Sequence, residues 1–327
     1  MKHVSILVPQ GPCILSSVIG AFKVFSTVNM ALAEQGKRPF FKIQLIGLSN
    51  ETPLYDGLFV VRPEVLLKDA SKADLIIIPA LQGDIPISLK MNAAYIPWIV
   101  DQYKQGAEVA SLCTGAFLLA STGLLKGKKC STHWVAADAF RKAFPEVKLL
   151  AEKIITDELG MYSSGGAYSF LNLMIYLVEK FCGREMAVYC SKMLEIEIER
   201  KSQSPFAIFT GQKVHEDEPI KKAQLFMENN VSNKLSVDQL SEMFAISRRN
   251  FERRFKKATS NTPVEYLQRV KIEAAKKSLE SSRENINEVM YSVGYSDSKA
   301  FRTMFKKITG LSPVSYRNKY NREMAVF

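Results

Sequence analysis

Residues 237–266 read VDQLSEMFAISRRNFERRFKKATSNTPVEY, and residues 286–316 read INEVMYSVGYSDSKAFRTMFKKITGLSPVSY. Both stretches follow one pattern of apolar and basic positions. Matching residues are 49 apart up to the shared serine, Ser247 or Ser296, and 50 apart after it. The sequence therefore predicts one supersecondary module used twice. It also predicts that one residue is inserted at the start of the second basic helix.

Each copy is predicted to be a helix–turn–helix. In the first copy, Leu240 and Phe244 belong to an apolar stripe at helical spacing. A short turn leads to a second helix that is rich in arginine and lysine, with Phe251 and Phe255 on its buried edge. The second copy turns at Gly294, a residue that tolerates a left-handed backbone. Two short helices, the second one basic, are typical of a recognition helix in the major groove.

The charge distribution supports a nucleic-acid partner. The chain has a formal net charge of +11, and residues 218–327 hold 21 lysines and arginines against 12 acidic residues, a net of +9. The preceding 217 residues contribute only +2. Solvated lysine-rich faces are common, but here the charges fall on the second helix of both copies. A basic C-terminal third on a nearly neutral remainder indicates a DNA-binding module.

A long helix is expected between the two copies. Pro263 suits its first turn, and apolar residues recur from Val264 to about Glu280. Eighteen residues of helix span about 27 Å. That length can hold two recognition helices about one turn of B-DNA, roughly 34 Å, apart.

Residues 218–322 resemble the AraC/XylS family of bacterial DNA-binding domains. The resemblance rests on the stretch from Val293 to Arg317, which contains VGYSD, then Phe301 and FKK at 305–307, then SP at 312–313. It implies seven helices with two helix–turn–helix units joined by a linker helix. It also implies binding to double-stranded DNA at a promoter operator, with RNA polymerase as a candidate partner.

The residues expected to reach base edges lie near the start of each basic helix. Arginine and asparagine match the hydrogen-bonding edges of guanine and adenine. The predicted readers are Arg248, Arg249, Asn250, Arg253, Asp297, Ser298, Lys299 and Arg302. A second group is expected at phosphate or solvent: Arg254, Lys256, Lys306 and Lys307.

The first 190 residues are predicted to form an α/β domain. Strand-like runs alternate with helical ones, and the apolar run at 74–79 is typical of a strand buried on both faces. This alternation predicts a flavodoxin-like parallel sheet with helices on both faces. The chain shows no signal-peptide pattern and no apolar run approaching eighteen residues. Five cysteines, not in metal-like pairs, favour a reduced cytoplasmic protein.

The most informative local feature of this domain is ASLCTGA at 110–116. A strand ends, Cys113 takes the turn, and a helix of small residues begins. This is the sequence of a nucleophile elbow. A following helix N-terminus would lower the pKa of the thiol. A small buried cysteine is the simpler alternative.

The N-terminal residues resemble the class I glutamine amidotransferase-like/PfpI superfamily, and specifically the sensory domain of GlxA-type regulators. The matching segments are SLCTGAF at 111–117, GLL at 123–125, THW at 132–134 and SSGG at 163–166. The resemblance implies a sensory domain at 1–190, a linker at 191–217 and the DNA-binding domain at 218–322. It also implies a homodimer formed through the N-terminal domain.

Several residues depart from the catalytic members of that superfamily. Thr114 stands where PfpI-like proteases have histidine, and Ser16 or Ser17 stands where a glutamate is expected. Asn172 replaces an expected aspartate. We therefore expect no hydrolysis, no cofactor and no metal. We expect instead that Cys113, Thr114, His133, Ser164 and Gly165 line a pocket for a small metabolite.

Two alternatives differ in function class. One is a cysteine-dependent amidase, protease or deglycase that uses Cys113 as its nucleophile. The other is a non-specific DNA-packaging protein. Two unlike recognition helices on one linker argue against packaging, because such a protein has no use for two different reading faces.

Overall fold

The computed structural model describes residues 1–198 and 202–321, and it divides the chain into two compact units, Met1–Gln203 and Ser204–Phe327. The connector predicted at 191–217 is split between them. Its residues up to Gln203 belong to the first unit, and those from Ser204 belong to the second.

The first unit is built on a mainly parallel sheet, as predicted. Its strands, in sheet order, are β10 (Ile155–Glu158), β11 (Met161–Ser164), β7 (Glu108–Leu112), β6 (Leu75–Ile78), β1 (Lys2–Val8), β2 (Phe41–Gly47) and β5 (Val65–Leu66). Neighbouring strands run parallel except β10 and β11, which form a hairpin. The carboxyl ends of β7 and β11 therefore meet at one edge of the sheet, and this brings the elbow next to the SSGG turn.

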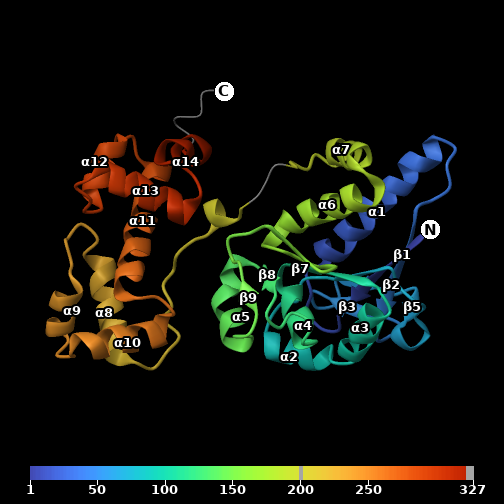
Figure 1. The fold of residues 1–327 in the computed structure, drawn as a ribbon, viewed down its shortest axis with the longest axis horizontal. Coiled ribbons are helices and arrows are strands. Elements are labelled where there is room, and N and C mark those ends of the chain that lie inside the picture. Colours follow the sequence, from blue (N-terminus) through green and yellow to red (C-terminus); the bar gives the residue numbers. More distant parts are fainter. Residues whose placement is uncertain (199–201, 322–327) are drawn as a thin grey trace. The chain divides into compact units, whose positions relative to one another are not determined.

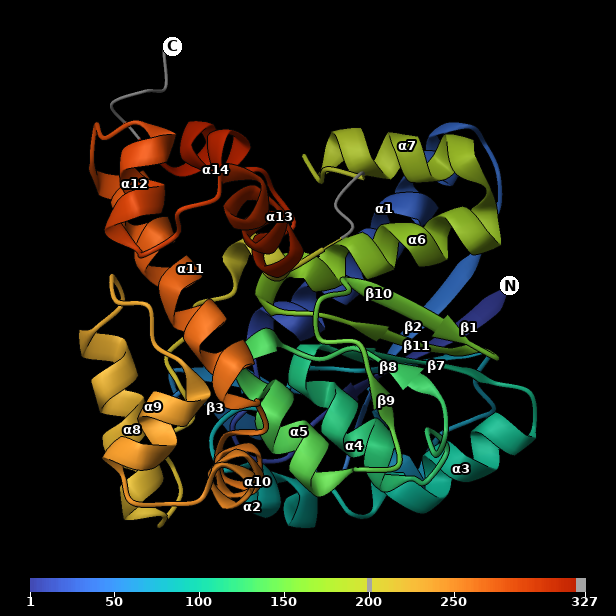
Figure 2. The same cartoon turned by 60° about the vertical axis from the view of Figure 1, so that its left-hand side comes forward.

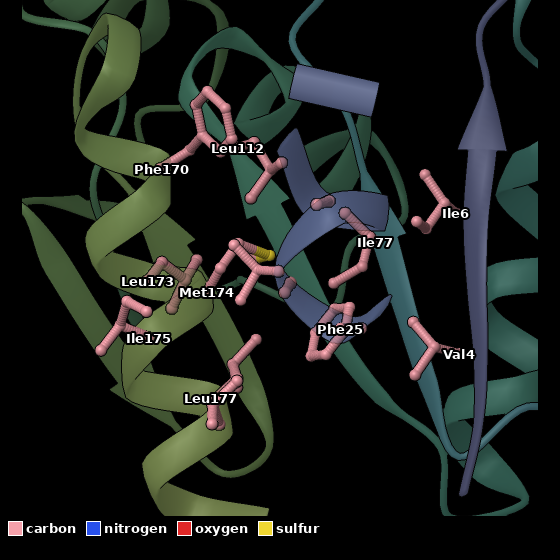
Figure 3. Close-up of a cluster of buried hydrophobic side chains, with 14 of the residues drawn as sticks. Val4, Ile6, Phe25, Ile77, Leu112, Phe170, Leu173, Met174, Ile175 and Leu177 are labelled. Carbon is pink, nitrogen blue, oxygen red and sulfur yellow. The ribbon is translucent and has the colours of Figure 1, made fainter. Parts of the chain in front are cut away.

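Helices cover both faces of the sheet (Figure 2). One face packs against α1 (Leu15–Glu34), α6 (Phe170–Cys182) and α7 (Arg184–Met193). The other packs against α2 (Ile85–Met91), α3 (Tyr95–Lys104), α4 (Ala116–Ser121) and α5 (Ala137–Ala143). Figure 3 shows the first core, where Leu173 and Met174 of α6 and Phe25 of α1 meet Val4 and Ile77 of the sheet.

Short elements complete the first unit. They are the strands β3 (Thr52–Leu54), β4 (Phe59–Val61), β8 (Lys129–Cys130) and β9 (Lys148–Leu149), and the 3-10 turns η1 (Leu67–Asp69), η2 (Cys113–Gly115), η3 (Trp134–Ala136) and η4 (Ala167–Ser169). Turn η2 follows directly on β7, and η4 follows β11 after Gly165 and Gly166, so both stand where the candidate site is expected.

The prediction that no segment is long and apolar enough to span a bilayer is wrong by length and composition. Helix α1 has 20 residues and a mean hydropathy of 1.4 over its best window. Polar residues interrupt it, so it does not read as an unbroken apolar run. Val18, Ala21, Phe25 and Val28 of α1 are buried against the sheet, as in the core helix of a soluble domain.

The second unit is helical (Figure 1). After η5 (Ser204–Phe206), its helices within residues 204–321 are α8 (Glu218–Asn229), α9 (Val237–Met243), α10 (Arg248–Thr259), α11 (Pro263–Ser281), α12 (Ile286–Ser292), α13 (Ser298–Thr309) and α14 (Pro313–Tyr320). The predicted linker helix is α11, and the two predicted helix–turn–helix units are α9–α10 and α12–α13. Thr262 caps α11 in a capping box with Glu265, so the helix begins at Pro263.

The duplication extends to the packing of each half. Phe255 contacts Tyr266 with ring centroids 5.2 Å apart, and Phe305 contacts Tyr316 at 5.4 Å. The members of each pair stand at the same sequence spacing, and all four rings are fully buried. Each basic helix is therefore anchored to the following helix by one aromatic pair, which leaves its charged side chains outside.

The inserted residue lies in a turn. Ala245 and Gly294 follow the first helix of each unit with φ of 51° and 74°. These residues are still 49 apart, whereas the N-caps of the next helices, Ser247 and Asp297, are 50 apart. The prediction that the insertion falls at the start of the second basic helix is therefore wrong. The turn after Gly294 is one residue longer, and both basic helices have 12 residues.

Candidate functional site

The predicted base-reading residues of the first helix–turn–helix lie on the outer face of α10. Arg248, Arg249, Asn250 and Arg253 are all exposed, because Phe251 and Phe255 turn the opposite face into the core. All four residues lie in the first two turns of the helix.

Two of these arginines are held by neighbours. Arg248 donates two hydrogen bonds to Asp238 of α9 and a longer one to Glu252. Arg253 Nη2 donates to Asn250 Oδ1 at 2.8 Å. The Arg253–Asn250 pair therefore presents a pre-oriented set of donors, whereas the guanidinium of Arg248 is shared with two carboxylates.

The predicted base-reading residues at the start of α13 differ in chemistry from those of α10. Lys299 and Arg302 are exposed and Ser298 is half-buried. Asp297 is the N-cap, and its Oδ1 accepts from Ala300 N at 2.7 Å. One of the four predicted readers on this helix thus also stabilises the helix end. The two basic helices share their buried residues but differ in the side chains they expose.

In the N-terminal unit, Met1–Gln203, the backbone at Cys113 is strained. Cys113 has φ of 54°, a left-handed value that is uncommon for a residue other than glycine, asparagine or aspartate. A Cβ at the nearby Gly115 would lie 2.5 Å from the carbonyl oxygens of Ile78 and Pro79, so the helix start packs directly on β6. This strand–turn–helix is the geometry of a nucleophile elbow.

The thiol of this elbow is less acidic than an ordinary cysteine. Burial raises the pKa of Cys113, and hydrogen bonds from the backbone of Ala167 and from Thr114 offset only part of that effect. The expectation that a helix N-terminus lowers this pKa is therefore wrong. Helix α4 has only six residues, and burial of the thiol is the largest cause of the shift in its pKa.

The residues predicted to share the pocket are only partly together. Cys113 N donates to Ser164 Oγ at 3.3 Å, and Thr132 Oγ1 donates to Cys113 O at 2.9 Å. Thr114 Oγ1 donates to Leu81 O. His133 Nδ1 accepts from Val135 N, and within the described residues its ring makes no hydrogen bond to Cys113.

No carboxylate stands at the position where catalytic relatives are expected to have one. Ser17 is fully buried; its hydroxyl donates to Ile14 O and accepts from Ala80 N at 3.0 Å. This serine holds the start of α1 against the end of β6. Both of its polar functions are used on the backbone, so it has no proton-transfer role toward the thiol.

Family models match both units. Residues 30–180 match the DJ-1/PfpI family, and residues 240–319 match a helix-turn-helix domain. The HTH-type transcriptional regulator GbdR of Pseudomonas aeruginosa is 26% identical over 259 residues, which cover 79% of this chain and 69% of that protein. GlxA of Rhizobium meliloti, also an HTH-type transcriptional regulator, is 23% identical over 65% of this chain and 66% of its own length.

The chain is a GlxA-type transcriptional regulator. A solved structure, a putative transcriptional regulator protein from Vibrio parahaemolyticus, matches 59% of this chain and 98% of its own, with a TM-score of 0.53 and 26% identity. A ThiJ/PfpI family protein from Pseudomonas syringae, 18% identical with a TM-score of 0.51 over 61% of this chain and 76% of its own, shows the same fold. The regulator therefore joins a DJ-1/PfpI domain to a DNA-binding domain of the AraC type.

Arg254 of the regulator was predicted to contact phosphate or solvent, and that prediction is wrong. Its guanidinium makes a two-point ion pair with Asp217, at 2.9 and 2.6 Å. Asp217 also caps α8 through Ile220 N. Arg254 therefore ties α10 to the start of α8. The two residues are 37 positions apart, so periodicity gave no signal for the pair.

Lys271 was missed by the sequence reasoning. It lies on α11 and is 7% exposed. Its ammonium donates to Asn233 O in the first half at 3.1 Å and to Val293 O in the second half at 3.0 Å. Burial lowers the pKa of Lys271. This single side chain thus links the two helix–turn–helix units across the linker helix.

Gln203 was missed as well. It is 2% exposed, and its amide nitrogen donates to Thr132 O at 2.8 Å while its amide oxygen accepts from Gly166 N at 2.9 Å. Asn172, where an aspartate was expected, donates its amide to Glu197 O. An ionised aspartate could not donate to a carbonyl. Both amides hold the chain segment that leads to the DNA-binding unit.

Proposed function

We propose that this DNA-binding regulator reads two unlike half-sites in successive turns of the major groove, and that its DJ-1/PfpI domain is a non-catalytic sensor of a small metabolite. One observation supports the first part above all others. Helices α10 and α13 repeat their buried residues at the same spacing but expose Arg249, Asn250 and Arg253 in one case and Lys299 and Arg302 in the other.

Selection from a random DNA library tests the reading proposal. The full-length chain should enrich one sequence with two different elements about ten base pairs apart, because α11 has 19 residues and a length of about 28 Å. A chain that enriches no sequence, or the same element twice, contradicts this reading.

Three observations support a non-catalytic elbow. The pKa of Cys113 is raised by burial. Ser17, one of the two serines at the position where a glutamate was expected, is committed to the backbone. Thr114, which follows the cysteine, directs its hydroxyl to Leu81 O. A thiol without a base and with little thiolate at neutral pH is a poor nucleophile.

We expect Cys113→Ala to leave operator binding in the absence of effector within about twofold of the parent chain, because the change removes only a neutral buried thiol. In the parent chain, iodoacetamide should modify Cys113 more slowly at pH 7 than a free thiol, with the rate rising steeply as pH rises toward the elevated pKa. Peptide mass spectrometry measures the rate. Rapid alkylation at pH 7, or turnover that the alanine variant loses, would instead support the cysteine-dependent enzyme.

The sensing proposal rests on polar groups gathered at the carboxyl ends of β7 and β11, where open α/β sheets bind ligands. Cys113, Thr114, His133, Ser164 and Gly165 are the proposed lining. The proposed effector is a small nitrogenous metabolite. Calorimetric titration of the full chain with a panel of such metabolites tests it, with His133→Ala as the variant that should lose the signal.

We further propose a cytoplasmic homodimer that forms through the sensory domain and acts with RNA polymerase. Ile19, Phe22 and Met30 are exposed and lie along one side of α1, which supports a partner on this helix. Sedimentation of the full chain should give twice the mass of one chain. A monomer at the concentrations that bind DNA would contradict the dimer.

A further inference from the structure

We propose that Gln203 is an internal ligand of the sensory domain, and that its primary carboxamide couples the elbow site to the DNA-binding unit. The site it occupies is defined here as the carboxamide cradle: the backbone groups of Thr132, Trp134, Ala151, Lys153 and Gly166. The inference rests on the proposed sensing function and extends it to the route of signal transfer.

The cradle is complementary to a carboxamide. The amide oxygen of Gln203 accepts from Gly166 N at 2.9 Å and from Trp134 N at 3.3 Å. The amide nitrogen faces three carbonyl oxygens, those of Thr132, Ala151 and Lys153, at 2.8, 2.5 and 3.3 Å. Backbone N–H groups thus donate to the amide oxygen, and backbone carbonyl oxygens accept from the amide nitrogen, all around one buried side chain. A carboxylate or an aliphatic group would leave several of these buried groups unpaired.

Glycine is needed at two positions for the amide to fit. A Cβ at Gly165 would lie 2.7 Å from Gln203 Nε2, and one at Gly166 would lie 3.2 Å from Gln203 Oε1 and 2.8 Å from the His133 ring. Gly166 has φ of −57°, which other residues adopt freely, so its lack of a side chain reflects this close approach.

The cradle and the elbow share their residues. Thr132 accepts from Gln203 through its carbonyl and donates to Cys113 O through its hydroxyl. The turn after β11 lies beside both, since Gly166 N donates to Gln203 and Ser164 Oγ accepts from Cys113 N. Two routes therefore join the elbow to Gln203, one through Thr132 alone and one through the turn from Ser164 to Gly166.

Gln203 is also adjacent to the DNA-binding unit in sequence. The second unit begins at Ser204. Ser202 and Gln203 run beside residues 152–153, with Gln203 N bonded to Glu152 O. Among the described residues upstream, Ile198 packs against the core of the first unit and Glu197 is held by Asn172. A ligand that moves Thr132 or the Gly166 turn would loosen Gln203 and let Ser202 and Gln203 join the tether to the second unit.

A longer tether weakens binding by a dimer. The second DNA-binding unit of a bound dimer acts at an effective concentration that is highest when the tether matches the distance between the sites and falls as the tether lengthens beyond it. Release of the cradle should therefore lower operator affinity without any change on α10 or α13. The proposed coupling therefore acts through the segment that joins the two units and leaves the base-reading residues unchanged.

The test compares four full-length variants: Gln203→Ala, Gly165→Ala, the double variant, and Gln105→Ala. Gln105 is an exposed glutamine of the same domain and serves as the matched control. Hydrogen exchange of the peptides that contain Trp134 and Gly166 should become at least tenfold faster in the first three variants and stay unchanged in the control. The operator dissociation constant should rise threefold or more in the same three. The double variant should show the same exchange rate and operator affinity as each single variant, because all three disrupt the same contact between Gln203 and the carboxamide cradle.

Unchanged exchange in Gln203→Ala would overturn the cradle. Faster exchange with operator affinity within 1.5-fold of the parent would overturn the coupling and leave a purely structural contact. If Gln203→Ala does not fold, Gln203→Asn keeps the amide but is too short to reach the cradle, and the same outcomes decide. Failure of the sensing proposal gives a different result. The three cradle variants would still shift operator affinity together, but no metabolite would change the operator affinity of the parent chain.

Discussion

Arg253→Ala is expected to weaken binding to the selected operator about 10- to 100-fold, or about 1–3 kcal/mol, the range for loss of one good base contact. Binding to an unrelated duplex should weaken by no more than about threefold. Arg253 is exposed on the second turn of α10, and Asn250 fixes its guanidinium at 2.8 Å. A pre-oriented fork loses little rotamer entropy when it meets a guanine edge.

Two neighbouring variants serve as controls for this result. Lys257→Ala removes an exposed charge at the end of the same helix and should weaken specific and unrelated DNA about equally, with a smaller salt dependence. Arg254→Ala should lower stability instead, because it breaks the ion pair with Asp217. Equal loss on both kinds of DNA in Arg253→Ala would place this arginine among the phosphate contacts.

Gly294→Ala is expected to destabilise the DNA-binding unit by about 2–5 kcal/mol. The residue has φ of 74°, where an alanine is strained. Its Cβ would lie 2.4 Å from Ser232 O and 2.5 Å from Lys271 Nζ, so the buried ammonium must give up part of its hydrogen bonding. The link between the two halves would be lost with it, so operator affinity should fall as well.

The repeat supplies a control at the matching position. Ala245 has φ of 51°, and Ala245→Gly should be neutral or stabilising by less than about 1 kcal/mol. Calorimetry of the full chain reports the unfolding of both units. Tryptophan fluorescence follows the first unit alone, because Trp98 and Trp134 are both in it. A Gly294→Ala chain that melts like the parent, or one that also shifts the tryptophan transition, would contradict this account.

Much of the fold was predictable because it follows from periodicity. The apolar stripes and aromatic spacings of the repeat predicted α9–α13, and the apolar run at 74–79 predicted β6. Pairings between distant residues carry no such signal. Arg254–Asp217, Lys271 with two carbonyls, and Gln203 in its cradle each depend on the tertiary fold.

The elbow at Cys113 was likewise only partly predictable from the sequence. Its strand–turn–helix order predicted an elbow at Cys113, and the structure shows that this residue has a left-handed backbone. The direction of the thiol pKa was predicted wrongly, because burial depth is a property of the packed domain. Asn172 was recognised as a departure from the family, and its contact with Glu197 O now gives the physical reason for the amide.

The central claim is that α10 and α13 read different halves of one operator. Selection of DNA sequences by Arg253→Ala and, separately, by Arg302→Ala tests it most directly, since both residues are exposed at positions one residue apart in the repeat register. We expect Arg253→Ala to relax base preference in one half-site only and Arg302→Ala to relax it in the other only. Relaxation of the same positions by both variants, or of none by either, would contradict it.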